Sequence, residues 1–216
     1  KIIIVNNKQS KELLSLYLRE NKNKFIDKFV PINFESTKNY LTPSYKLGKY
    51  ILSCGQSNRD YATLAKALKN YNKDVIISCP KNYFEQFSFN KNILFYETKN
   101  TISMINLIRD AKFLVIPLND DFTTAGIKIL CWGLELGKAM IVSKKNHYLE
   151  MYGSLPPFIY VESNSEILLH NAIYDLDNND DKIISLGKKA REWSLMNHTS
   201  SEYINTLWKN HVKKID

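Results

Sequence analysis

Short apolar runs alternate with segments of helical periodicity along most of the chain. Each run is too short for a helix and has the composition of a strand buried on both faces. The runs that predict strands are residues 1–5, 29–32, 50–53, 75–78, 93–95, 113–116, 139–142 and 158–161. Apolar residues at helical spacing predict helices at residues 10–20, 61–70, 102–111 and 127–134, and three more after residue 163. This alternation predicts an α/β, doubly wound, Rossmann-like parallel sheet with right-handed crossovers and helices on both faces.

A polar stretch at residues 33–47, followed by Gly48, is typical of a linker and carries Pro43 near its end. We therefore predict a boundary near residue 45. Residues 1–45 are expected to be the end of one α/β domain and a linker, residues 46–200 a second α/β domain, and residues 201–216 a C-terminal helix. Since the chain starts within a strand-like run and without Met, we expect that an upstream part of the protein is missing from it.

The composition fits a globular protein with a core. The chain has 216 residues, 44% of them hydrophobic, and only seven Gly and six Pro. The net charge is +8, but the lysines are interleaved with Asn, Asp and Glu, and no block of like charges appears. This pattern favours a solvated lysine-rich surface over a nucleic-acid interface, with weak attraction to acidic lipid or a phosphorylated ligand as the alternative. Three Cys in buried-looking elements indicate free thiols and predict a cytoplasmic location.

Several kinds of catalytic or cofactor site are not indicated. The four His are far apart and at no metal-ligand spacing, so no metal site is predicted. The chain has no Walker loop, no G-x-G-x-x-G fingerprint and no Ser-centred elbow. What remains is a pair of turns that follow the carboxyl ends of predicted strands.

The first turn, residues 55–60, combines a Gly that permits close backbone approach with Ser57 and with Arg59, a forked donor suited to phosphate. The second, residues 120–126, has two carboxylates, two Thr hydroxyls and a helix opened by small residues. At such a helix start the backbone N–H groups and the positive end of the helix dipole attract anions. Together the turns predict a cleft that holds an anion at one end and a polyhydroxylated group at the other.

Residues 50–145 resemble the donor-binding half of a GT-B glycosyltransferase of the family-4 type, the glycosyl transferases group 1. Two groups of residues carry the resemblance. The first is Gly55 with Arg59-Asp60-Tyr61, and the second is Pro117, Asp121, Ala125-Gly126 and Gly137-Lys138-Ala139-Met140-Ile141. The resemblance implies transfer of a sugar from a nucleoside diphosphate sugar, with retention of anomeric configuration, and it makes residues 46–200 the nucleotide-sugar-binding domain.

The resemblance also implies roles for individual residues. Arg59 and the N–H groups around Ala125 and Gly126 would hold the departing diphosphate, and Asp121 would orient the donor sugar. Further donor contacts are expected from Gly55, Ser57, Tyr96, Glu97, Thr123, Thr124, Lys128 and Trp132. The family carries a ribose-binding glutamate where Trp132 stands, and it commonly has a second basic residue where Gln56 stands.

We therefore predict a glycosyltransferase that acts on a hydroxyl of a glycan, lipid or polysaccharide and needs no metal or other cofactor. Peripheral association with an acidic membrane surface is an additional expectation. Trp132, in place of a carboxylate, motivates an alternative: a non-catalytic GT-B-like subunit that binds a partner enzyme or a membrane. A nucleotide-sugar epimerase of related architecture is a third hypothesis.

Overall fold

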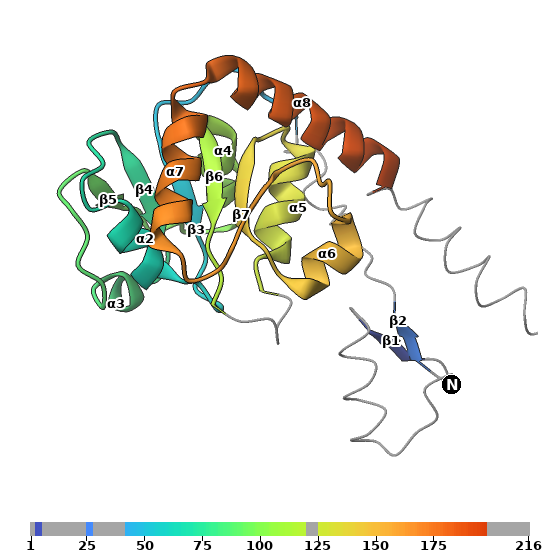
Figure 1. The fold of residues 1–216 in the computed structure, drawn as a ribbon, viewed down its shortest axis with the longest axis horizontal. Coiled ribbons are helices and arrows are strands. Elements are labelled where there is room, and N and C mark those ends of the chain that lie inside the picture. Colours follow the sequence, from blue (N-terminus) through green and yellow to red (C-terminus); the bar gives the residue numbers. More distant parts are fainter. Residues whose placement is uncertain (1–2, 6–24, 28–41, 120–124, 198–216) are drawn as a thin grey trace, which may run out of the picture.

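The centre of the fold is one parallel sheet of six strands (Figure 1). The computed structural model describes residues 3–5, 25–27, 42–119 and 125–197. The strands are β3 (Ile51–Cys54), β4 (Val75–Ser78), β5 (Ile93–Phe95), β6 (Phe113–Ile116), β7 (Met140–Ser143) and β8 (Ile159–Val161). Their order in the sheet is β5-β4-β3-β6-β7-β8, and every neighbouring pair is parallel. The predicted α/β fold with a parallel sheet is confirmed.

Helices cover both faces of this sheet, as predicted. They are α2 (Tyr61–Ala67), α3 (Lys81–Phe84), α4 (Thr101–Asp110), α5 (Ile127–Glu135), α6 (Asn146–Tyr152), α7 (Glu166–Asp177) and α8 (Asp180–Asn197). Side chains of α4 and α5 form one core with the sheet, and those of α2 and α7 form the other. Helix α8 packs along α5 and also contacts α7 (Figure 1). The short helices α3 and α6 were not predicted.

The alternation of side chains along each strand supplies both cores. In β3, Leu52 and Cys54 point to the core under α4 and α5, whereas Ile51 points to the core under α2 and α7. All four residues of β3 and of β6 are buried, as expected for central strands of a parallel sheet. Each fully buried Leu, Ile or Phe contributes about 1.5 to 3 kcal/mol to folding.

The N-terminal part contributes a separate parallel pair of strands, β1 (Ile3–Val5) and β2 (Phe25–Asp27). Strand β1 was predicted. Strand β2 was not, and the strand predicted at residues 29–32 lies outside the described residues, as do the helices predicted at residues 10–20 and near the C-terminus. The division into domains at residues 45 and 200 stays a prediction.

Candidate functional site

The direction of strand addition reverses between β3 and β6. From β3 the chain adds β4 and β5 on one side, and from β6 it adds β7 and β8 on the other (Figure 1). In parallel α/β sheets, ligands bind at this switch point, outside the carboxyl ends of the strands. The loops that follow β3 and β6 are the two turns identified in the sequence. The fold therefore places the first turn, and residues 117–119 and 125–126 on either side of the second, at the position where a ligand is expected.

Backbone and side-chain hydrogen bonds join the two loops. The Asp60 N–H donates to the carbonyl of Pro117 at 3.1 Å, and the Asn119 N–H donates to the carbonyl of Asn58 at 3.2 Å. The side-chain amide of Asn119 also donates to the carbonyl of Arg59 at 3.1 Å. The start of the β6 loop is thus fixed against the β3 loop.

Arg59 is buried where the β3 loop contacts the β6 loop, with 3% of its surface exposed. Its Nε donates to the carbonyl of Cys54 and its Nη1 to the carbonyl of Ser57, both at 2.9 Å. The guanidinium lies against two glycines: a Cβ on Gly55 would be 2.7 Å from Nη2, and one on Gly126 would be 3.6 Å from Nη1. Arg59 is therefore a fixed cation between the β3 loop and the start of α5, and not a solvated residue at the start of a helix.

Gly126 is the N-cap of α5 and has a left-handed backbone with φ +88°. The hydroxyl of Tyr148 donates to the carbonyl of Ala125 at 2.6 Å. A Cβ on Gly126 would lie 2.7 Å from this hydroxyl and 3.1 Å from Cγ2 of Ile116. Burial raises the pKa of Tyr148, although Arg59 lowers it in part, so the hydroxyl keeps its proton and remains a donor. Both the conformation and the close contacts require glycine at the start of this helix.

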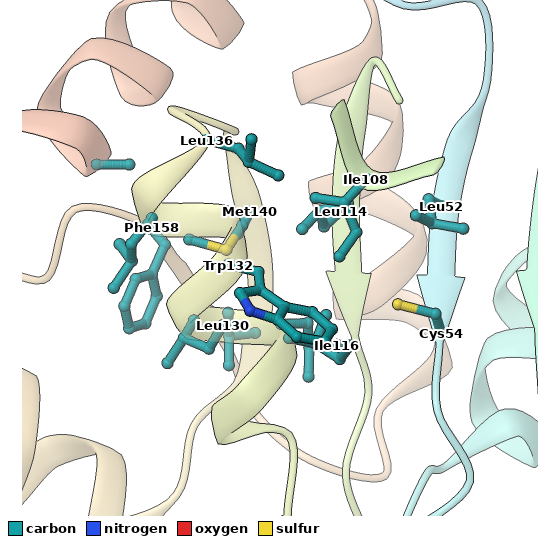
Figure 2. Packing of buried hydrophobic residues seen from close by; sticks show 14 of the residues in the cluster. Leu52, Cys54, Ile108, Leu114, Ile116, Leu130, Trp132, Leu136, Met140 and Phe158 are labelled. Carbon is teal, nitrogen blue, oxygen red and sulfur yellow. The ribbon is translucent and has the colours of Figure 1, made fainter. Parts of the chain in front are cut away.

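Helix α5 is more deeply buried than its sequence pattern indicates. The predicted stripe was residues 127, 130, 131 and 134. Every residue from Ile129 to Glu135 is buried, because α5 packs against α8 as well as against the sheet. The helical spacing of Trp132 allowed a position facing the cleft or a packing position, and the structure has the second: Trp132 is 4% exposed and lies in the core near Leu130 and Ile116 (Figure 2). Lys128 is exposed, with its ammonium 4.7 Å from the centroid of the Trp132 ring.

The other predicted donor contacts are dispersed. Ser57 is exposed and offers its carbonyl to Arg59. Tyr96 and Glu97 are exposed after β5, an edge strand two positions from β3, and the Tyr96 N–H donates to the carbonyl of Ile77 at 3.0 Å. Their roles stay predictions. Three further predicted residues lie outside the described residues: Asp121, Thr123 and Thr124.

The loop after β7 also reaches this edge of the sheet, and sequence reasoning did not include it. The Leu118 N–H donates to Oγ of Ser143 at 2.9 Å, which connects the β6 loop to the end of β7. Two residues later, Lys145 is buried. The signal available in the sequence was a pair of lysines directly after a predicted strand that neighbours the run at residues 113–116 in chain order.

Metal ligands and reactive thiols are not features of the described part of the chain. Within it, no group of three His, Cys, Asp or Glu side chains could hold a metal ion. The three cysteines are buried free thiols, as predicted. Burial raises the pKa of Cys54 to about 12 and that of Cys79 to about 11, so neither is a thiolate nucleophile at neutral pH. None of the helices in the described ranges combines the length and apolar composition that a membrane span needs.

Solved structures share this fold over nearly the whole chain. HepE of Anabaena, crystallised with UDP and glucose, has a TM-score of 0.75 at 10% identity, over 99% of this chain and 63% of its own. A glycosyltransferase of Rickettsia africae has a TM-score of 0.68 at 13% identity, over 97% of this chain and 62% of its own. The C-terminal domain of the glycosyl transferase group 1 protein LpcC of Francisella tularensis has a TM-score of 0.56 at 14% identity, over 79% and 95%.

These likenesses show that the chain has the fold of GT-B glycosyltransferases, as the motifs predicted. The chain spans 62% to 64% of the length of the first three structures that it matches. No protein-family model matches the sequence, and no curated protein matches it.

Proposed function

We propose that this chain is the donor-binding part of a glycosyltransferase that transfers a sugar from a nucleoside diphosphate sugar to a hydroxyl acceptor. The observation that supports this most is the buried Arg59 between Gly55 and Gly126, at the switch point of a GT-B sheet. A fixed guanidinium beside a helix N-terminus is suited to an anion that gains charge during the reaction.

In this proposal Arg59 contacts the departing diphosphate. A guanidinium has five N–H donors, and within the described residues two of them are used, by the carbonyls of Cys54 and Ser57. The two bonds hold the guanidinium plane, and the remaining donors are left for phosphate oxygens. Because the cation is fixed in advance, it stabilises the leaving group without reorganisation in the transition state.

The start of α5 supplies the second attraction. Gly126 has no side chain to cover the first N–H groups of the nine-residue helix, so a phosphate can approach them closely. The hydroxyl of Tyr148 donates to the preceding carbonyl of Ala125 and so fixes the backbone at the start of the helix. The positive end of the helix dipole and Arg59 then act on the same diphosphate, which makes a metal ion unnecessary in this proposal.

The sugar and the base would lie on either side of the diphosphate. Asp121 would accept hydrogen bonds from donor-sugar hydroxyls and favour the oxocarbenium-like state, with retention of the anomeric configuration. The base would lie toward Tyr96 and Glu97. Thr123, Thr124 and Lys128 would add polar contacts near the start of α5. Trp132 supports the helix from within the core and is not proposed as a ligand contact.

The acceptor is proposed to be a hydroxyl of a carbohydrate or lipid, met at the cytoplasmic side. The net charge of +8 supports peripheral attraction to an acidic membrane surface. Flotation of the full-length protein with liposomes tests this attraction: we expect binding to vesicles with acidic lipid and none to neutral vesicles. Equal binding to both would contradict the electrostatic basis.

Arg59→Ala tests the donor site, with Arg191→Ala as a matched control. Arg191 also donates to a backbone carbonyl, that of Glu135 at 2.8 Å, but it does so at the C-terminal end of α5. Calorimetry with UDP, GDP, ADP and their sugars on the full-length protein should show binding of one nucleotide class. We expect Arg59→Ala to weaken this binding by at least about tenfold, and Arg191→Ala to leave it unchanged.

Two results would reject the proposal. One is the failure of every nucleoside diphosphate and nucleoside diphosphate sugar to bind the wild-type protein. The other is a folded Arg59→Ala variant whose donor affinity and transferase rate equal those of the wild type. Donor binding without turnover for any acceptor would instead favour the non-catalytic subunit.

A further inference from the structure

The loop between α6 and β8 carries the most exposed large apolar side chain of the described residues. Leu155 has 94% of its surface exposed, in the uncharged stretch Gly153-Ser154-Leu155-Pro156-Pro157. Proline fixes its own φ and also restricts the residue before it, so the two prolines limit the conformations of this loop. A single exposed leucine is ordinary on a protein surface. Its meaning therefore depends on what lies beside it.

A second apolar segment lies beside this loop, at the C-terminal end of α8. Leu195 is 56% exposed and Met196 is 67% exposed. An open groove of about 520 Å³ separates the loop from the helix, and it is lined by residues 154–158, Tyr160, Lys189, Glu192, Trp193 and Met196. Apolar side chains from two segments that are distant in the sequence thus meet at one hollow of the surface.

Aromatic contacts connect the two walls of the groove. The ring centroid of Tyr152, at the end of α6, lies 4.9 Å from that of Trp193 and 5.3 Å from that of Phe158. The ring of Phe158 also contacts that of Tyr160, at 5.2 Å. Tyr152 and Phe158 belong to the core under α4 and α5. The groove is therefore built on the core, and it needs no rearrangement before it binds a partner.

The charges beside the groove are mainly positive. In residues 188–197 of α8 three cations, Lys188, Lys189 and Arg191, accompany a single carboxylate, Glu192. Lys188 and Lys189 are exposed, and neither forms an ion pair within the part of the chain that the structure describes. An apolar surface flanked by exposed lysines complements a bilayer of acidic lipid, because the apolar side chains enter the acyl boundary while the lysines stay at the phosphates.

Helix α7 has exposed apolar residues in the opposite electrostatic setting. Ile167 is 68% exposed, and Leu168 and Tyr174 are also exposed. The twelve residues of α7 include three carboxylates and no lysine or arginine. This surface would repel acidic lipid, so it provides a control with similar exposure and opposite charge.

We propose that the groove between residues 154–158 and the end of α8 docks on an acidic phospholipid bilayer. Leu155 and Met196 enter the boundary between headgroups and acyl chains, and Lys188 and Lys189 contact lipid phosphates. The inference extends the membrane attraction of the proposed function, because it assigns a defined surface and an apolar contribution that salt does not screen. It involves neither Arg59 nor the start of α5, so it is independent of donor binding.

Flotation of the full-length protein with vesicles of phosphatidylglycerol and phosphatidylcholine measures the contribution of each side chain. We expect Leu155→Ser to weaken vesicle binding by about tenfold, since it removes a leucine from the acyl boundary. Lys188→Gln and Lys189→Gln should each weaken it by about fivefold. Ile167→Ser on α7 is the control and should bind as the wild type does. The affinity for a nucleoside diphosphate should be the same in all of these variants.

A fluorescent probe tests the position of the contact. Leu155→Cys and the control Ile167→Cys are each labelled with an environment-sensitive thiol reagent, and the three native cysteines are buried and so protected from it. On addition of acidic vesicles we expect the emission of the probe at position 155 to shift to the blue and that of the probe at position 167 to stay unchanged. Vesicles of phosphatidylcholine alone should shift neither.

Four results would overturn this inference. Leu155→Ser that binds acidic vesicles as tightly as the wild type, or a probe at position 155 that does not shift although the protein floats, would place the contact elsewhere. A wild-type protein that binds no vesicles would reject both this surface and the proposed membrane attraction, while donor binding would still stand. Self-association in light scattering that Leu155→Ser abolishes would assign the groove to a second copy of the chain.

Discussion

The charged residues named here are paired differently at the two ends of the parallel strands. We call the end where the strands begin the amino edge and the end where they finish the carboxyl edge. At the edge where the strands begin, Asp177 neutralises the lysines. Its Oδ1 lies 3.0 Å from Nζ of Lys112, its Oδ2 accepts the hydroxyl of Tyr71 at 2.6 Å, and Lys73 forms a further ion pair with it. Lys112 also pairs with Asp180 at 3.1 Å. These charged groups form ion pairs with one another and connect α7 to the sheet.

At the edge where the strands end, the buried cations lack such partners. Arg59 bonds to backbone carbonyls, and neither Arg59 nor Lys145 forms an ion pair with a carboxylate in the described residues. Among the described residues, Lys73 and Lys112 are therefore paired with carboxylates at one edge, whereas Arg59 is held by backbone carbonyls at the other. The difference indicates that the Asp177 cluster serves stability, whereas Arg59 is a fixed cation at the carboxyl ends of the strands.

The largest effect is expected from Asp177→Ala at the amino edge. Burial alone would raise the pKa of Asp177, but hydrogen bonds from Lys73, Tyr71 and Lys112 outweigh this and lower it. Removal of the carboxylate leaves these groups without their common partner and should lower the free energy of unfolding by about 3 to 5 kcal/mol. Urea unfolding at pH 7 measures the loss, and nucleoside diphosphate affinity of the folded variant should not change.

The pH dependence provides a check on the same residue. Because the folded pKa lies below the unfolded one, the contribution of Asp177 is present above the unfolded pKa and is lost as pH falls through the folded pKa. Asp175→Ala, an exposed neighbour on α7, is the control. Equal unfolding curves for the two variants would contradict the role of the charge cluster.

Gly126→Ala is expected to disrupt the start of α5 at the carboxyl edge. Its left-handed backbone and the 2.7 Å approach of a Cβ to the Tyr148 hydroxyl predict a loss of about 2 to 4 kcal/mol in stability. Because the start of α5 must shift, nucleoside diphosphate affinity should fall as well. Gly153→Ala is matched to it: Gly153 has φ +72°, but a Cβ there meets no atom within 4 Å. The control should lose less stability and no affinity; an equal loss of affinity would remove α5 from the site.

Glu135→Gln tests the end of α5 at the amino edge. Burial raises the pKa of Glu135 from 4.5 to about 7, with Arg191 lowering it in part. A raised folded pKa means that the stabilising form is the protonated one: its contribution is complete below pH 4.5 and is lost as pH rises through 7. Glutamine cannot ionise, so Glu135→Gln should gain about 2 kcal/mol on the wild type between pH 5 and pH 8. The melting temperatures of Glu135→Gln and of the wild type are compared at pH 5 and at pH 8. An equal difference at both pH values would contradict the raised pKa of Glu135.

Tyr148→Phe gives the smallest expected effect. The variant loses the hydrogen bond to Ala125 and should be destabilised by about 1 kcal/mol, with a few-fold loss of nucleoside diphosphate affinity as α5 loosens. Tyr160→Phe is the control, because the buried Tyr160 hydroxyl has no hydrogen-bond partner in the described part of the chain. Thermal unfolding and calorimetry compare the two. A Tyr160→Phe variant as weakened as Tyr148→Phe would show that the affinity loss is not specific to the site.

The fold was predictable because a short apolar run in the sequence marks each strand of the sheet. Four-residue apolar runs at residues 75–78 and 113–116 coincide with β4 and β6, and alternation with helices leads to a parallel sheet. The two candidate turns follow the ends of β3 and β6, so their positions could be predicted together with the strands. The short helices α3 and α6 escaped prediction since four and seven residues are too few to show a helical period.

What the sequence did not reveal depends on contacts between distant segments. The burial of Trp132 depends on packing against residues such as Ile116 of β6, and no pattern within α5 contains that information. Arg59 is buried only because Gly55 and Gly126 leave room for its guanidinium. Each of these residues needed the assembled sheet before its role could be inferred.

The most direct test of the central claim is a crystal structure of the full-length protein with the nucleoside diphosphate that it binds. We predict that the phosphates lie at the carboxyl ends of β3 and β6, within hydrogen-bond distance of the Arg59 guanidinium and the first N–H groups of α5. Phosphates bound at another place on the chain, with the contacts of Arg59 unchanged, would contradict the account.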